Sequence, residues 1–184
     1  GWTKPYLAMG NGVIELSDMS IKDNLIVIPG DSFTSNDGEF DPFSEYVVVE
    51  LYTPNGLNYY DSHEKYPDRP QGITTNGVKI YHIDNRKFIS DVSNPYDISM
   101  KEYDPAVDVI DDTHRLLLPI TNSIDPDVFT IQWGLDVSYD LFDEIRLIEA
   151  TNWDTFTTGG YQKEYTLFHE GDTFDIATYG NSFF

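Results

Sequence analysis

EYVVVELY at residues 45–52 and GVKIYHID at residues 77–84 are the two stretches that decide the fold. Both are rich in β-branched and aromatic residues, which favour strands. Shorter stretches of similar character predict further strands at 13–16, 25–28, 115–120, 128–133, 145–149 and 164–168. LIVI at 25–28 is wholly apolar, which predicts burial on both faces, and 145–149 fits a helix as well as a strand. We therefore expect a mainly β protein, an antiparallel, sandwich-like single domain over residues 1–184.

Long polar segments separate these strands. Among the 184 residues are 22 Asp but only 10 Glu, and Asp favours turns because its short side chain hydrogen-bonds nearby backbone groups. The polar segments at 29–44, 53–76 and 91–113 hold most of the turn-forming residues. Loops of this length are commonly functional or cover another part of the protein, so we expect long acidic loops on a β-rich core.

Charge excludes several classes of partner. Eleven Lys and Arg against 32 Asp and Glu give a net charge of −21, whereas nucleic-acid binding needs clustered Lys and Arg. The same charge opposes docking on anionic lipid, and no apolar run reaches the roughly 18 residues that span a bilayer. The chain has no Cys, so it has no disulfide and no Cys-ligated zinc. We expect neither nucleic-acid binding nor membrane insertion.

No self-contained catalytic motif is present in the sequence. A zinc-binding His-Glu-x-x-His helix would need a second His, but neither His63-Glu64 nor His169-Glu170 is followed by one at the required spacing. Phosphate-binding Gly-rich loops and the Gly-x-Ser-x-Gly motif of serine hydrolases are also missing. We therefore expect no catalytic residue within this chain.

The two strongest strands could place a carboxylate beside a histidine. Side chains alternate between the faces of a strand, so Glu50 lies on one face of 45–52, and His82 and Asp84 share one face of 77–84. If the strands are antiparallel neighbours with those faces matched, Glu50 lies near His82, and Asp84 could hold the imidazole. Such a group could support an active site, or it could only lock the sheet through charge pairing.

Two further groups of residues suggest ligands. Calcium takes six to eight oxygen ligands, and Asp104, Asp108, Asp111 and Asp112 supply four carboxylates within nine residues. A second set is Asp37, Glu39 and Asp41, and neither set has the EF-hand spacing. The alternative is that both are solvated loops. Surface aromatic residues could stack on sugars, with Trp133, Trp153 and Tyr161 as candidates, or these residues could instead anchor the core or a loop.

Several segments together resemble a known family. SEYVVVELYTPNGLNYYDS at 44–62 and GVKIYHIDNR at 77–86 resemble two strands of the immune inhibitor A family of secreted bacterial zinc metallopeptidases. HRLLLPITNS at 114–123 and YTLFHEGDTFD at 165–175 resemble later segments of the same region of that family.

The resemblance implies that the chain is the β-rich region that follows the catalytic helices of a longer, secreted bacterial protein. The zinc would belong to the parent protein, on a His-Glu-x-x-His helix upstream of this chain. The partners implied are that upstream catalytic domain and a protein or peptide substrate. Glu50, His82 and Asp84 are the motif residues that carry over. The alternative is an extracellular calcium- or glycan-binding β-module without protease activity.

Overall fold

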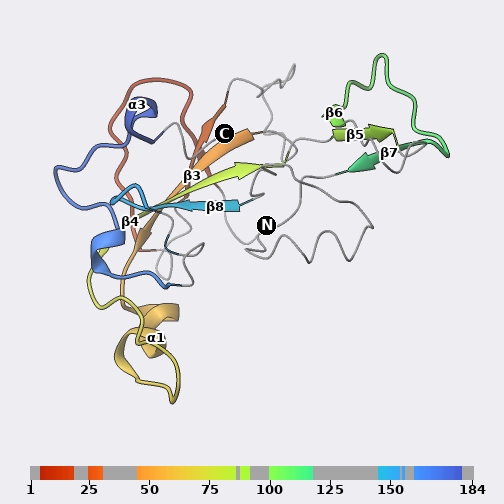
Figure 1. The fold of residues 1–184 in the computed structure, drawn as a ribbon. Coiled ribbons are helices and arrows are strands. Elements are labelled where there is room, and N and C mark those ends of the chain that lie inside the picture. Colours follow the sequence, from red (N-terminus) through yellow and green to blue (C-terminus); the bar gives the residue numbers. More distant parts are fainter. Residues whose placement is uncertain are drawn as a thin grey trace. The chain divides into compact units, whose positions relative to one another are not determined.

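The computed structural model describes residues 5–18, 25–30, 45–85, 88–91, 100–117, 145–153, 155 and 160–179. These residues form a mainly β protein with few and short helices (Figure 1). The chain divides into two compact units. One comprises Gly1–Gly30, Tyr46–His82 and Leu147–Phe184, and the other comprises Asp31–Glu45 and Ile83–Arg146.

A five-stranded sheet has the order β1-β2-β3-β4-β8. Its strands are β1 (Tyr6–Leu7), β2 (Leu25–Pro29), β3 (Glu45–Tyr52), β4 (Gly77–Asp84) and β8 (Ile145–Ile148). β1 pairs with β2 in parallel, with Tyr6 opposite Ile26, whereas β2 and β3 are antiparallel, with Val27 opposite Val48. The sheet is therefore mixed, and the expected wholly antiparallel arrangement is corrected at β1.

A second, three-stranded sheet has the order β6-β5-β7 and lies in the other compact unit. Its strands are β5 (Phe88–Asp91), β6 (Met100–Glu102) and β7 (His114–Leu117). β5 pairs antiparallel with both neighbours, and Ile89 lies opposite Lys101 on one side and Leu116 on the other. Ile89 is buried, as expected for an apolar residue of a central strand.

Short helices occur in the connections. The 53–76 segment between β3 and β4 contains the 3-10 helix η1 (Gly56–Asn58) and the α-helix α1 (Tyr59–His63). The C-terminal part holds the 3-10 helix η2 (Glu164–Thr166) and α3 (Ile176–Tyr179). Of the helices described, none is long and apolar enough to cross a membrane.

Among the described residues, the core forms two separate clusters. Ile80, Ile148, Phe168 and Tyr179 form the larger one, which we call the aromatic cluster. Partly buried residues pack against it from β3, β4 and the C-terminal segment: Val47, Val49, Val78, Ala150 and Phe174. The smaller cluster, which we call the Tyr52 cluster, consists of Tyr52, Ile73 and Leu167.

Most of the expected strands that fall on described residues are confirmed. The strands at 45–52 and 77–84 have the expected bounds, 145–149 is a strand and not a helix, and β7 covers the start of 115–120. The expected strand at 25–28 forms, and Ile26 and Val27 on its two faces are both buried, whereas Ile28 is exposed.

Two expected strands do not form. Residues 13–16 have no strand structure, and none of the described strands pairs with them. Of 164–168, the first three residues are η2 and only Phe168 makes a β-bridge, to Val78. The strand expected at 128–133, the end of 115–120 and most of the 29–44 loop lie outside the described residues.

Candidate functional site

Glu50 lies on a polar face of the β3–β4 pair. The Tyr81 hydroxyl donates a hydrogen bond to Glu50 Oε1 at 3.0 Å, and the Lys79 ammonium lies 4.4 Å from the centroid of the Tyr52 ring. Moving from Glu50 to Tyr52 along β3 corresponds to moving back from Tyr81 to Lys79 along β4, as expected of antiparallel neighbours. Because side chains two apart share a face, these four residues belong to one face of the pair.

His82 and Asp84 belong to the opposite face. They alternate with Tyr81 along β4 and follow Ile80, which packs with Val49 in the aromatic cluster. His82 is 4% exposed and Asp84 is 0% exposed. Contrary to the expectation from the sequence, Glu50 therefore does not share a face with His82 and Asp84. The register differs by one residue from the expected one, and such a shift turns every side chain of a strand to the other face. Whether the three residues support an active site or lock the sheet stays a prediction.

Burial and charge shift the titration of two residues beside Glu50. Burial, together with the Glu50 charge and its hydrogen bond, raises the pKa of Tyr81 well above its ordinary value. Burial lowers the pKa of Lys79, and the opposing attraction of Glu50 is the smaller effect. Lys79 is therefore a partly desolvated cation whose charged form is disfavoured by its surroundings.

Tyr52 ties the 53–73 segment to the end of β3. Its hydroxyl donates to the Ile73 carbonyl oxygen at 2.9 Å and lies 3.1 Å from Ser62 Oγ. Ser62 is fully buried and donates to the Asn58 carbonyl oxygen at 2.6 Å. Gln71 Nε2 donates to the Ser62 carbonyl oxygen at 2.6 Å, which closes the segment on itself. The segment is thus held by polar contacts around one buried serine.

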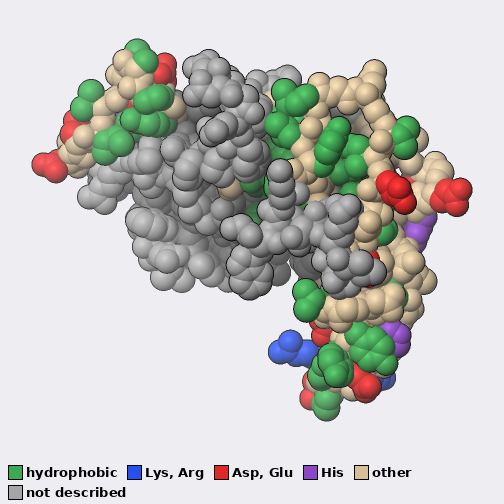
Figure 2. Space-filling view, turned by 180° about the vertical axis from the view of Figure 1, so that it is seen from behind, with side chains coloured by type: hydrophobic (Ala, Val, Ile, Leu, Met, Phe, Trp, Pro, Cys, Tyr) green, Lys and Arg blue, Asp and Glu red, His purple; other side chains and the backbone are tan. Residues whose placement is uncertain are grey.

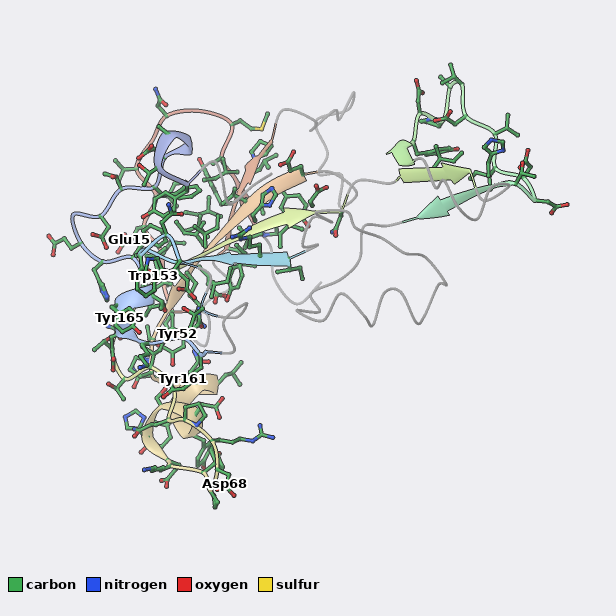
Figure 3. All side chains as sticks on the ribbon, in the orientation of Figure 1. Glu15, Tyr52, Asp68, Trp153, Tyr161 and Tyr165 are labelled. Carbon is green, nitrogen blue, oxygen red and sulfur yellow. The ribbon has the colours of Figure 1, made fainter. Side chains whose placement is uncertain are left out.

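A hollow of about 280 Å³ opens between this segment and the C-terminal part of the chain. Figure 3 shows Tyr52 and Tyr161 beside each other at the end of the sheet where α1 projects, with Asp68 at the far tip of that segment. The walls come from the end of β3, from β4, from the α1 segment and from residues 161–162, and they are Tyr52, Asn58, Asp61, Pro70, Gln71, Gly72, Ile73, Lys79, Tyr161 and Gln162.

Two wider hollows adjoin the first one. They measure about 530 and 840 Å³ and share Pro70 with it, and Tyr161 lines the smaller of the two. Lys65, Tyr66 and Arg69 add basic and aromatic groups to their walls. In the view of Figure 2, the Lys and Arg side chains that can be seen gather at the segment that contains α1, among apolar and acidic ones.

The expected calcium loop is divided between two turns. In the first, the Asp104 amide donates to Asp108 Oδ2 at 2.9 Å, and the Ala106 amide donates to Asp104 Oδ1 at 2.8 Å. In the second, Asp111 Oδ1 accepts from the amides of Thr113 and His114 at 2.7 and 2.8 Å. Within the part of the chain that the structure describes, no group of three or more His, Asp or Glu could hold a metal ion.

Asp111 is the centre of the second turn. Its Oδ1 also accepts from Thr113 Oγ1 at 2.8 Å and lies 3.0 Å from His114 Nδ1. Hydrogen bonds from Thr113, followed by those from His114, hold the pKa of Asp111 well below its ordinary value. Asp112, next to it, is exposed. The calcium site therefore stays a prediction, and its second candidate set, Asp37, Glu39 and Asp41, lies outside the described residues.

The aromatic residues considered for sugar stacking have different positions. Trp153 is 75% exposed and Tyr161 is also exposed, whereas Trp133 lies outside the described residues. The Lys163 ammonium lies 5.3 Å from the Tyr161 ring centroid and 5.9 Å from that of Tyr165. Tyr161 thus joins the wall of the hollow to an exposed basic and aromatic surface.

Glu149 is a buried carboxylate that no sequence pattern reveals. It follows β8, is 1% exposed and accepts hydrogen bonds from the Thr155 hydroxyl at 2.5 Å and the Thr155 amide at 3.2 Å. These bonds, with a longer one of 3.4 Å from the Thr151 hydroxyl, satisfy the carboxylate inside a loop. Glu149 therefore fixes the turn after β8.

Comparisons of this chain with protein-family models, with curated proteins and with solved structures find no match.

Proposed function

We propose that this chain is the β-rich region of a longer, secreted bacterial zinc metallopeptidase of the immune inhibitor A type, and that it hydrolyses no peptide bonds alone. One observation carries the proposal. The two segments with the most specific resemblance, 44–62 and 77–86, contain β3 and β4, which are neighbours in the five-stranded sheet. The sequence has no His-Glu-x-x-His motif, so the zinc and its ligands belong to an upstream domain.

In this proposal His82 and Asp84 lock the sheet and do not touch substrate. Both are buried and both take part in interactions within the fold. Burying a charged or polar group is costly unless it is paired, so such groups fix one arrangement of a sheet. Glu50 acts with Tyr81 on the other face in the same way. The finer architecture that we propose is a sandwich-like packing of β-sheets that supports the catalytic domain.

The test compares two proteins, the 184-residue chain and the same chain preceded by its natural upstream segment. With zinc present, we expect casein hydrolysis only from the longer protein, and we expect a chelator to abolish it. Chelator-sensitive hydrolysis by the 184-residue chain, or an upstream segment without a His-Glu-x-x-His motif, would contradict the proposal. In the longer protein, His82→Asn should lower the melting temperature while leaving the kcat of the folded fraction unchanged. A lower kcat with unchanged stability would place His82 in the active site instead.

A further inference from the structure

Two hydrogen-bond donors without acceptors face the small hollow beside Tyr52. Of the residues the structure describes, Gln162 has the one buried side-chain polar atom without a hydrogen-bond partner, its Nε2. The Lys79 ammonium lies over the Tyr52 ring, and no hydrogen bond from it is found among the described residues. Both side chains line the hollow of about 280 Å³. A buried donor left unsatisfied is costly, so each such group in a folded protein calls for an explanation.

We propose that this hollow binds a carboxylate presented by a peptide, with the Lys79 ammonium and the Gln162 amide as its two donors. A carboxylate accepts several hydrogen bonds and carries the charge that would balance the partly desolvated ammonium. A hollow of about 280 Å³ admits an acidic side chain with part of the peptide that carries it, and it is far too small for a folded domain. A neutral acceptor would satisfy Gln162 but would add no negative charge beside Lys79, whose burial outweighs the attraction of Glu50.

The surroundings indicate what flanks the carboxylate. Tyr161 belongs to both the small hollow and an adjoining wider one, whose walls include Tyr66, Pro67 and Pro70. These rings offer apolar contacts to the residues on either side of the acidic one. Arg69 and Lys65 on the same wall supply further positive charge.

Acidic groups near the hollow limit the charge of the ligand. Asp61 lines the small hollow and Asp68 lines a wider one, and the whole chain carries a net charge of −21. A run of acidic residues would be repelled by these groups, since like charges at close range disfavour binding. The structure therefore favours a single carboxylate between apolar residues.

The binding test adds four probes in turn to the 184-residue chain. Binding is measured by the changes that each probe causes in the 1H–15N amide spectrum of the protein. The first pair is acetyl-Pro-Glu-Pro-amide and its Gln counterpart, which differ only in the side-chain charge. The third probe is acetyl-Pro-Gln-Pro with a free C-terminus, which presents a terminal carboxylate, and the fourth is neutral chitotriose. We expect the Glu peptide to shift the Gln162 side-chain signal with a Kd of about 0.1–1 mM, and the Gln peptide to bind about tenfold more weakly. The C-terminal probe decides whether a terminal carboxylate binds as well as a side-chain one.

Three variants locate the site. Lys79→Met keeps the apolar stem over Tyr52 and removes the charge, and we expect it to weaken the Glu peptide about tenfold. Lys163→Met changes the net charge equally, but Lys163 does not line the small hollow, so we expect less than about a threefold change. Gln162→Glu places a carboxylate at the hollow on a side chain outside any helix or strand, so it should block binding in a folded protein.

Several results would overturn the proposal. Equal binding of the Glu and Gln peptides would show that the hollow does not recognise a carboxylate. Binding of chitotriose alone would make the hollow a sugar site. An equal loss of affinity in Lys79→Met and Lys163→Met would mean that the peptide responds to the net charge of the protein and not to Lys79. No shift at Gln162 with any probe would leave water as the occupant of the hollow.

Discussion

The two faces of the β3–β4 pair are built from the same two strands in different ways. On one face Ile80, Val47 and Val49 pack into the aromatic cluster with Phe168 and Tyr179. On the other face Tyr81 donates to Glu50, and Lys79 lies over Tyr52. The first face gains stability from buried apolar area and also encloses His82 and Asp84, whereas the second holds polar groups beside an open hollow. A binding function is therefore more readily placed on the second face.

The largest effect is expected on the aromatic face. Ile80→Ala removes a buried side chain from the centre of the aromatic cluster and should lower the free energy of unfolding by about 2–5 kcal/mol. Leu57→Ala is the matched control, because Leu57 is exposed, and it should change stability by less than about 0.5 kcal/mol. Urea unfolding measures both. A loss at Ile80 no larger than that at Leu57 would mean that the aromatic cluster is not the core.

The next effect tests how closely the chain packs at the other face. A methyl group at Gly77 would lie 2.6 Å from Leu167 Cβ and 2.8 Å from Cδ1, so Gly77→Ala should destabilise the fold by about 1–3 kcal/mol. Gly12→Ala is the control, because nothing lies within 4 Å of a methyl group there.

A double variant tests whether the clash causes this loss. In a Leu167→Ala background two of the three close atoms are gone, so Gly77→Ala should cost less than it does alone. Leu167 Cβ at 2.6 Å remains in this background, so additive losses in urea unfolding would show that the contacts with Cγ and Cδ1 do not cause the loss.

A smaller effect concerns the hydroxyl of Tyr52. Tyr52→Phe removes the hydrogen bond to the Ile73 carbonyl oxygen and should cost about 1–2 kcal/mol. Tyr165→Phe makes the same change at an exposed ring and should be close to neutral. Amide hydrogen exchange should be faster across residues 58–73 in Tyr52→Phe alone. Unchanged exchange there would mean that Tyr52 does not hold the segment.

The sequence predicts strands much better than it predicts which faces meet. EYVVVELY and GVKIYHID form strands with the expected bounds because β-branched and aromatic residues decide the local conformation. Apolar residues stand on both faces of 45–52, so the pattern does not choose a register, and Glu50 meets Tyr81 instead of sharing a face with His82. Residues 13–16 have a similar local character but pair with none of the described strands.

The hollow has no signature in the sequence at all. Its two donors, Lys79 and Gln162, come from distant segments that the fold brings to the same end of the sheet. Neither residue belongs to a motif, and a lone Gln between Tyr161 and Lys163 gives no sign of burial. In the acidic loop the short spacing predicts one calcium site, which stays a prediction, and hydrogen bonds to the backbone place Asp104 and Asp111 in two separate turns. Local spacing therefore says little about where side chains converge.

The smallest effect is expected from removing the charge of Lys79. Burial lowers its pKa below the ordinary value of 10.5, so between the two values the unfolded chain binds more protons than the folded one. The neutral form of Lys79 therefore contributes stability above pH 10.5, and this contribution is lost as the pH falls through the lowered pKa. At pH 7 the charged ammonium lowers the stability of the fold. Lys79→Met removes that cost and also the contact with the Tyr52 ring, so stability at pH 7 should stay within about 0.5 kcal/mol of the parent. The stability of the variant relative to the parent should then decrease as the pH rises towards 10.5.

The raised pKa of Tyr81 lowers stability above its ordinary value of 10.0 in both proteins, so it largely cancels in their difference. Urea midpoints at several pH values measure the effect, and a relative stability that increases with pH would mean that Lys79 stabilises the fold as a cation.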